Sequence, residues 1–276
     1  MIAYRAMLDV PKELARYLSG LLAAERRRRG TRQGTRRLTP YRQAVFALAW
    51  FRKKEDIEVL GAGFGLSRAT AYRYHGEAVA VLAAQAPDLH QALEQVTTDG
   101  WQYLILDGTV IGADRASTPT VSAKGQVIDL WYAGKNHHHG GLVQGLMRPD
   151  GVPVWLSDVE PGSVHDLTAA RTHALPALYA AAAAGLPTLA DGGYTGAGIG
   201  IHVPVKQPGG TQVLDSDTRT RNALLRGLRA QGERGFALLK TRWRALQHVT
   251  ACPHKIGDTA KAALVLTQFE HKMIRC

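Results

Sequence analysis

The chain has 276 residues, of which 45% are hydrophobic and 21% charged, so it can bury a core and is not disordered as a whole. Its net charge of +11 favours a polyanionic partner, nucleic acid first, over a membrane surface. No apolar run approaches the length of a membrane span, and the first residues lack a signal-peptide core. Two cysteines, Cys252 and Cys276, are too few for a disulfide scaffold or a cysteine zinc site. We therefore expect a cytoplasmic protein that does not contact a membrane.

The basic charge is concentrated near the N-terminus. Residues 25–37 contain seven arginines, one glutamate and no apolar side chain. This composition is typical of a solvated linker, and it also suits a mobile arm that grips phosphates. The two interpretations are compatible.

Residues 38–84 follow with the pattern of three helices. Thr39-Pro40 resembles an N-cap with proline at the first helical position, and Ser67 is placed to cap the last helix after a glycine-rich turn. A short helix, a turn and a capped helix in this order are typical of a helix-turn-helix, whose last helix enters the major groove with its first residues. The alternative is a small helical bundle that binds nothing, but the adjacent basic segment favours DNA. The residues expected to face DNA are Arg68, Thr70, Tyr72 and Arg73.

The periodicity changes near residue 100, where strand-like patterns begin. We therefore predict an all-α helix-turn-helix domain over residues 1–95, including the basic arm 25–37, and an α/β domain over residues 96–276. A helical pattern over residues 162–185 contains Pro176, which predicts a kink or a division. A turn at residues 148–151 between two apolar runs predicts a hairpin. The other predicted strands cover residues 101–112, 126–134, 186–191 and 200–206, and a long helix covers residues 219–247.

Two aspartates occupy unusual places in these strands. Asp107 lies inside an apolar strand, where a charge is costly unless it faces a cleft or binds something. Asp191 ends the strand that leads into "LADGGYTG". That stretch is typical of an Asp-Gly turn, but it also suits an acid held at a strand end, with bare backbone that lets a bulky ligand approach.

A third acid, Glu233, lies in the long helix. It is spaced to pair with Arg229 one turn earlier. Three glycines nearby, each costing the helix about 1 kcal/mol relative to alanine, indicate instead a close approach of another backbone or a ligand. The apolar stripe expected to face the core is Leu225, Leu228, Phe236, Leu239, Trp243 and Leu246.

Together the three acids indicate a divalent-metal site. Mg²⁺ prefers a few carboxylates, waters and phosphate oxygens. Two such ions about 3.5–4 Å apart can activate a nucleophile and stabilise the leaving oxygen of a phosphodiester.

Four stretches resemble those of bacterial insertion-sequence transposases with an Asp-Asp-Glu site, and the resemblance covers essentially the whole chain: "LILDGT", "KNHHHGGLVQGLMRPDGVPVWLSDVEPGSVHDL", "LADGGYTG" and "NALLRGLRAQGERGFALLKTRWRAL". It implies a ribonuclease-H-like mixed sheet flanked by helices, preceded by an all-α helix-turn-helix domain. The acids of that site match Asp107, Asp191 and Glu233, with Lys240 seven residues after the glutamate and Arg229 four before it. A tyrosine found in some relatives is replaced here by Arg226.

The resemblance implies a metal-dependent DNA endonuclease that cleaves and transfers strands at the terminal inverted repeats of an insertion sequence. Asp107, Asp191 and Glu233 would hold Mg²⁺ or Mn²⁺, with two ions expected, and Arg229 and Lys240 would position phosphate. Lys135 and His139 are further candidates for phosphate contact. The partner would be double-stranded DNA, bound by a homodimer near the bacterial nucleoid.

Alternatives stay open. The chain could be a host nuclease of the same core fold or a regulator derived from a transposase. Asp166, three residues after Ser163, favours a capping box over a metal role. The run His137-His138-His139 favours DNA contact or plain surface over zinc, because consecutive side chains point different ways.

Overall fold

A computed structural model of the chain describes residues 7–122, 125–210 and 212–274. The chain forms two compact units, each of which combines separate segments. Unit 1 contains the N-terminal segment up to Ala86, residues 240–247 and the segment from Asp258 onward. Unit 2 contains residues 87–239 and 248–257. The sequence patterns do not predict that these C-terminal segments belong to unit 1, because their place depends on packing between residues far apart in the chain.

Unit 1 is helical. As predicted, Thr39 caps the second helix by accepting a hydrogen bond from the Arg42 amide. Asp56 caps the third in the same way, and the Ser67 hydroxyl at the start of the fourth donates to Thr70 instead. The helices that begin in the N-terminal segment are α1 (Lys12–Arg28), α2 (Pro40–Lys53), α3 (Ile57–Gly63) and α4 (Arg68–Ala83). Residues from Asp258 onward in α9 (Ile256–Glu270), a helix that the sequence analysis did not predict, complete the unit.

The basic segment is anchored to unit 1 at two of its arginines. Arg26 donates from Nη2 to Gln43 Oε1 over 2.6 Å, and Arg36 donates from Nη2 to Glu77 Oε1 over 2.8 Å. Gln43 also donates to Glu77 Oε2, so the buried Glu77 carboxylate is paired from two sides. The other five arginines lie at the surface: Arg27, Arg28, Arg29, Arg32 and Arg37. The grip on phosphates stays a prediction.

Unit 2 is built on a mixed sheet with β1 (Leu104–Ala113) at its centre. β1 pairs antiparallel with β5 (His138–Met147) and parallel with β8 (Thr188–Leu189), which pairs parallel with β9 (Ile201–His202). This arrangement confirms the predicted mixed sheet flanked by helices.

Shorter strands extend the two central ones. The predicted hairpin is present, because the chain turns through Gly151, at φ +84°, and returns as β6 (Pro153–Leu156) beside β5. β4 (Tyr132–Ala133) and β7 (Glu160–Pro161) also pair with β5, and β10 (His248–Val249) pairs with the end of β1. A separate hairpin joins β2 (Pro119–Val121) and β3 (Val127–Asp129).

The predicted helix over residues 162–185 is divided in two. α6 (Asp166–His173) ends at Ala174, and α7 (Leu175–Ala183) restarts with Pro176 in its first turn, where a missing N–H costs nothing. The other helical elements are α5 (Leu89–Thr98), α8 (Ser216–Arg242) and the 3-10 turns η1 (Gly192–Tyr194), η2 (Arg244–Gln247) and η3 (Pro253–Lys255).

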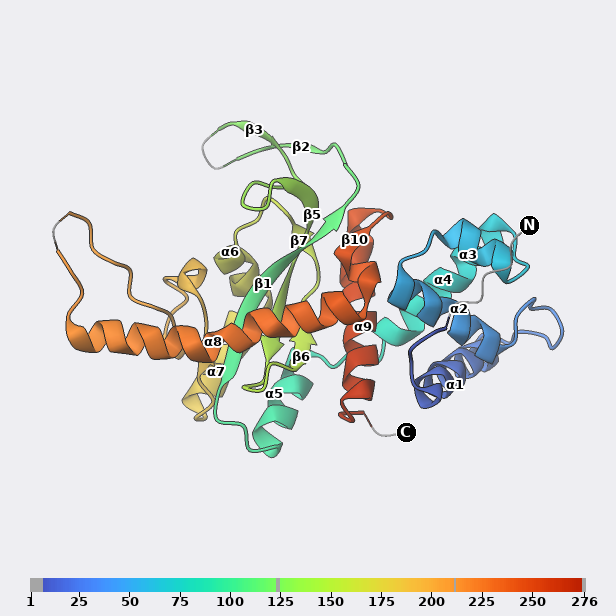
Figure 1. The fold of residues 1–276 in the computed structure, drawn as a ribbon, viewed down its shortest axis with the longest axis horizontal. Coiled ribbons are helices and arrows are strands. Elements are labelled where there is room, and N and C mark those ends of the chain that lie inside the picture. The colour runs from blue at the N-terminus through green and yellow to red at the C-terminus, as the bar shows by residue number, and fades with distance from the viewer. Residues whose placement is uncertain (1–6, 123–124, 211, 275–276) are drawn as a thin grey trace. The chain divides into compact units, whose positions relative to one another are not determined.

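Two glycines let α8 lie directly on the sheet (Figure 1). A Cβ at Gly232 would lie 2.7 Å from Ile105 Cγ2, and one at Gly235 would lie 2.7 Å from the Gly151 carbonyl oxygen. The predicted close approach is therefore confirmed at these two positions, whereas no described atom lies within 4 Å of a Cβ at Gly227. Successive strand residues point to opposite faces, so Gly108 faces away from α8 and toward α6.

The predicted apolar stripe is buried at every position except Leu228, where the prediction is wrong. Leu228 is 46% exposed. The strands at that end of the sheet, β8 and β9, are only two residues long and leave this part of the helix partly uncovered. The helix is shorter than predicted, because α8 ends at Arg242 and the stripe residues Trp243 and Leu246 lie beyond it. In the described part of the chain, no helix is both long enough and apolar enough to cross a membrane.

Candidate active site

Asp107 and Asp191 lie on neighbouring parallel strands. The register pairs Ile105 with Leu189, and continuing it by two residues brings Asp107 opposite Asp191, just past the end of β8. Adjacent strands are about 4.8 Å apart, so the two carboxylates share one patch of the sheet. Partial burial and then the charge of Asp191 raise the pKa of Asp107 to about 6.

Asp191 also makes the turn that its sequence suggested. Its carboxylate accepts a hydrogen bond of 2.8 Å from the Gly193 amide and caps η1. The local backbone therefore fits both interpretations of this stretch. Asp191 makes a turn, and it also follows a strand and is surrounded by glycine.

Asp166 joins these two acids from the first residue of α6. A Cβ at Gly108 would overlap the Asp166 carboxylate, and a Cβ at Gly193 would lie 3.8 Å from its Oδ2. Its negative charge also raises the pKa of Asp107. The carboxylate thus occupies space that the two glycines leave open, between β1 and the turn that follows β8.

The capping box expected at Ser163 and Asp166 is not present. The N-cap of α6 is His165, and no side chain there accepts a capping hydrogen bond. Gln144 donates instead to Asp166 Oδ1 over 3.4 Å, so the carboxylate faces the sheet rather than the start of its own helix. Ser163 is close to Asp166 in the sequence, but the contact with Gln144 on β5 determines where the Asp166 carboxylate points.

Glu233 follows a glycine of α8 that packs against β1, but its side chain faces a cation. Its side chain is 65% exposed, and its Oε1 accepts from Arg229 Nη2 at 2.9 Å. Its neighbour Gly232 lies against β1, where a Cβ would be 3.6 Å from Asp107 Cβ. Arg229 is mostly buried and lowers the pKa of Asp107 through its charge. The pairing of Arg229 with Glu233 is therefore present, and the metal role of Glu233 stays a prediction.

The donor atoms suit a hard divalent cation. Among the described residues, no group of three or more His, Cys, Asp or Glu side chains has the geometry to hold a metal ion. The chemistry nevertheless fits, because Asp107, Asp166 and Asp191 are oxygen donors that repel one another and stand beside bare glycine backbone. The residues that would hold the ion are Asp107 and Asp191, with Glu233 as the helical acid.

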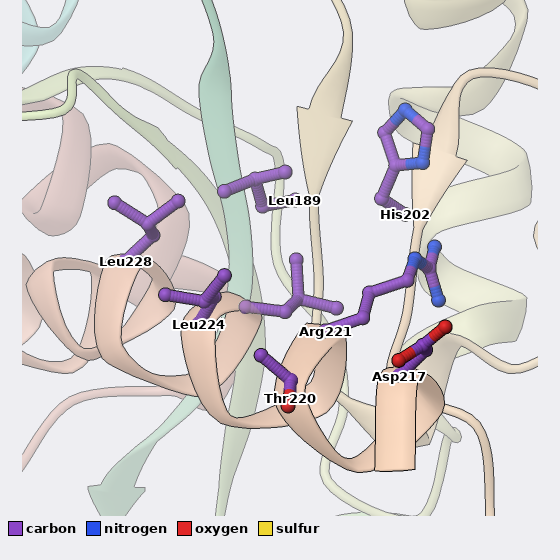
Figure 2. A pocket seen from close by; sticks show the side chains of 8 residues that line it. Leu189, His202, Asp217, Thr220, Arg221, Leu224 and Leu228 are labelled. Atoms are coloured by element: carbon purple, nitrogen blue, oxygen red, sulfur yellow. The ribbon is translucent and has the colours of Figure 1, made fainter. Parts of the chain in front are cut away.

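Two hollows of unit 2 lie near its sheet, and Asp166 lines the first of them. One, of about 480 Å³, is lined by Gly108, Asp166, Lys135 and the β4 region. The other, of about 600 Å³, lies along the first half of α8; Figure 2 shows Leu189, Leu224 and Leu228 at one end and His202, Arg221 and Asp217 at the other. Leu189 ends β8 two residues before Asp191, and Leu228 directly precedes Arg229, but none of the four acids lines this second hollow.

The cations predicted to contact phosphate are placed differently. Lys135 is brought to the acids, with its Nζ 3.8 Å from Asp166 Oδ2 and its side chain 79% exposed. His139 instead points its Nε2 at Asp129 Oδ2, 3.4 Å away, and packs beside Tyr132. Lys240 belongs to unit 1, whereas the acids belong to unit 2.

In unit 1, the start of α4 borders a hollow of about 630 Å³. Of the residues predicted to face DNA, Thr70, Tyr72 and Arg73 line it, together with Arg36 and Arg37 of the basic segment. Arg68 lies outside this lining and pairs with Glu58 at 3.3 Å. DNA contact by these residues stays a prediction.

Sequence reasoning missed two further residues beside the acids. Gln144 is fully buried on β5, and Tyr194 is buried in η1; the Tyr194 hydroxyl donates to Gln144 Oε1 over 2.5 Å. Burial and then the charges of Asp166, Asp107 and Asp191 raise the pKa of Tyr194. The available signal was a glutamine in the apolar run "GGLVQGLM", because a buried amide requires hydrogen-bond partners.

Aspartates drawn together on adjacent strands of a mixed sheet, with a helical acid and cations nearby, are typical of nucleases that act with divalent metal ions. A family model described as DDE superfamily endonuclease matches residues 106–268, more than half of the chain and all four acids. The chain therefore belongs to the DDE superfamily endonucleases, which are transposase-like nucleases that normally use divalent metals. Searches of curated proteins and of solved structures gave no match.

Proposed function

We propose that this protein is a DNA transposase that cleaves the terminal inverted repeats of an insertion sequence and transfers the freed strands to a target. The observation that carries the proposal is the placement of Asp107 opposite Asp191 at the centre of the sheet of a DDE endonuclease. Mg²⁺ or Mn²⁺, with two ions expected, would be bound by these aspartates and by Glu233. Ions held there would lower the pKa of an attacking water or 3′-hydroxyl and would stabilise the leaving oxygen.

The chain's own residues have separate tasks in this proposal. Asp107 binds from the central strand and Asp191 from the turn that follows β8, and the pairing of β1 with β8 fixes their spacing. Arg229 holds positive charge beside them and orients the Glu233 carboxylate through their 2.9 Å pair. The exposed Lys135 at the rim contacts a phosphate of the incoming strand. Gly192, where a Cβ would have no described atom within 4 Å, leaves room for a DNA backbone to approach.

Unit 1 supplies DNA binding in this proposal. α3, the turn at Gly65 and α4 act as a helix-turn-helix that reads the inverted repeats, and the basic segment beside α4 contacts phosphates. Arg36, Arg37 and Arg73 around one hollow support this assignment. Two protomers would hold the two ends of the element in one complex.

The test uses the full-length protein, the DNA flanking its gene, and Mn²⁺. Asp191→Ala is compared with Asp114→Ala, which removes an exposed carboxylate just past the end of the same central strand as Asp107. We expect cuts at the ends of an inverted repeat with the wild type and Asp114→Ala, and none with Asp191→Ala, although that variant still binds the repeat.

Other outcomes separate the alternatives. Cuts whose products never join a target duplex would indicate a host nuclease. Specific binding without any cut would indicate a regulator derived from a transposase. Cleavage that survives Asp191→Ala would overturn the proposed site.

A further inference from the structure

We infer that Asp166 is a metal ligand of this site, and that the buried pair Gln144–Tyr194 positions its carboxylate. The inference deepens the proposed function and rests on it. It adds a third aspartate to the two strand acids and assigns positioning roles to two residues outside the Asp-Asp-Glu set.

The Asp166 carboxylate lies beside two glycines that adjoin the strand acids. One oxygen, Oδ1, occupies the space beside Gly108, directly after Asp107, and the other, Oδ2, lies toward Gly193, two residues after Asp191. Any side chain at Gly108 would displace Oδ1, so the backbone on that side is kept bare for this carboxylate. The carboxylate therefore lies beside the backbone that adjoins both strand acids, on the side of the sheet that faces α6.

The second argument compares Asp166 with the helical acid. The Asp166 side chain is 22% exposed, whereas that of Glu233 is 65% exposed and already paired with Arg229. The cation beside Asp166 is Lys135, which lies 3.8 Å away on a largely exposed side chain. Such an exposed pair is screened by water and is weak, and the better buried Arg229 is already paired with Glu233, so these two cations do not balance the three aspartates and Glu233. A divalent cation does balance them.

The third argument is the hydrogen-bond chain behind Asp166. The phenol of Tyr194 donates its single proton to Gln144 Oε1, which leaves the Gln144 amide nitrogen to face the Asp166 carboxylate. Gln144 is held at the other end too, because its backbone N–H donates to the Ser157 hydroxyl over 2.9 Å. Both side chains are buried, where unpaired polar groups are costly. The buried pair therefore offers the Gln144 side-chain N–H as a donor, and the Asp166 carboxylate accepts its hydrogen bond.

The test of the ligand role measures Mn²⁺ binding to the full-length protein by electron paramagnetic resonance, without DNA and without turnover. Asp166→Asn keeps the shape of the side chain and removes its charge. We expect it to weaken Mn²⁺ binding by about tenfold or more, as Asp191→Asn does, while the matched Asp114→Asn leaves binding unchanged. Thermal melting of each variant without metal checks that it is folded.

The failures are distinguishable. If Asp191→Asn weakens Mn²⁺ binding and Asp166→Asn does not, the inference is wrong and the proposed function stands. If the wild type binds no Mn²⁺, or if Asp191→Asn binds it normally, the proposed site and the inference fall together.

The positioning role is tested with Tyr194→Phe, which removes only the hydroxyl. We expect Mn²⁺ affinity to fall by about tenfold in the wild-type background and to change little when Asp166→Asn is already present, because the hydroxyl acts through Asp166. Tyr179→Phe is the matched control, since it removes a hydroxyl that donates to the Ala197 carbonyl away from the acids. Equal losses in both backgrounds, or no loss, would overturn the positioning role.

Discussion

At the scale of single residues, the charged carboxylate of Asp107 lowers the stability of the folded chain when no cation is bound. Its carboxyl group is partly buried and lies beside two other acids, so its charged form is disfavoured in the folded chain and its pKa rises to about 6. The folded protein then holds a proton that the unfolded chain, with a carboxyl pKa near 3.8, has lost. The stability that this proton contributes is fully present below the unfolded value and is lost as pH rises through about 6.

Asp107→Asn is therefore expected to stabilise the metal-free protein at pH 8. The gain has an upper bound of about 3 kcal/mol, because two pKa units correspond to roughly that energy and residual solvent reduces it. Melting in a chelator at pH 8 and at pH 4 checks the sign, since the advantage of the variant should vanish at the lower pH. A wild type more stable than Asp107→Asn at pH 8 would contradict this account.

Addition of Mg²⁺ should reverse the order of stability. A cation that binds only the folded wild type adds about 2.7 kcal/mol at a hundred times its dissociation constant. We expect the melting temperature of the wild type to rise with Mg²⁺ at pH 8 and that of Asp107→Asn to respond little. Equal shifts for the two proteins would indicate binding elsewhere on the chain.

At the scale of elements, α8 combines a packing surface with the helical acid. Glycine is a poor helix former, yet Gly232 and Gly235 bring the helix axis close to β1 and the β5–β6 turn, and this closeness places Arg229 beside Asp107. Gly227 makes no such contact with described atoms. Glycine in α8 thus permits close packing at Gly232 and Gly235, whereas at Gly227 it only lowers the helix propensity.

The pair Gly227→Ala and Gly232→Ala separates these consequences. Gly227→Ala should raise the free energy of unfolding by up to about 1 kcal/mol through helix propensity. Gly232→Ala should lower it by about 1–3 kcal/mol, because its Cβ meets Ile105, and should also reduce cleavage by shifting Arg229 and Glu233. Chemical denaturation measures both changes, and stabilisation by Gly232→Ala would refute the packing argument.

At the scale of the whole molecule, the cationic side chains behind the net charge of +11 fall into two groups. Some arginines are held by internal partners, as Arg36 is by Glu77. Others are exposed, as Arg73 is at the start of α4 beside Thr70. Only exposed cations can exchange counterions for DNA phosphates, so the number of phosphate contacts should be smaller than the number of arginines suggests.

Arg73→Ala should weaken DNA binding and reduce the slope of log affinity against log salt by about one. Arg16→Ala is the control, because Arg16 is exposed on α1 and pairs loosely with Glu13 at 3.8 Å outside the lining of the hollow beside α4. Binding measured by fluorescence anisotropy over a range of salt gives both slopes. An unchanged slope for Arg73→Ala would place the DNA elsewhere.

The elements with strong local signals were predictable from the sequence. The Thr39-Pro40 helix start, the turn at Gly151 and the division at Pro176 each depend on backbone preferences of adjacent residues, and all three are present. Asp107 and Asp191 were also identifiable, because a charge in or directly after an apolar strand is costly and therefore conspicuous.

By itself, then, the sequence determined the class of fold, most of its elements and the two strand acids. Tertiary structure alone decided that Asp166 faces these acids instead of capping α6, that Gln144 and Tyr194 stand behind it, and that Leu228 is exposed. The physical reason is the range of the interactions. Helix starts and turns are set by neighbours along the chain, whereas the meeting of carboxylates depends on strand pairing and helix packing between residues far apart in it.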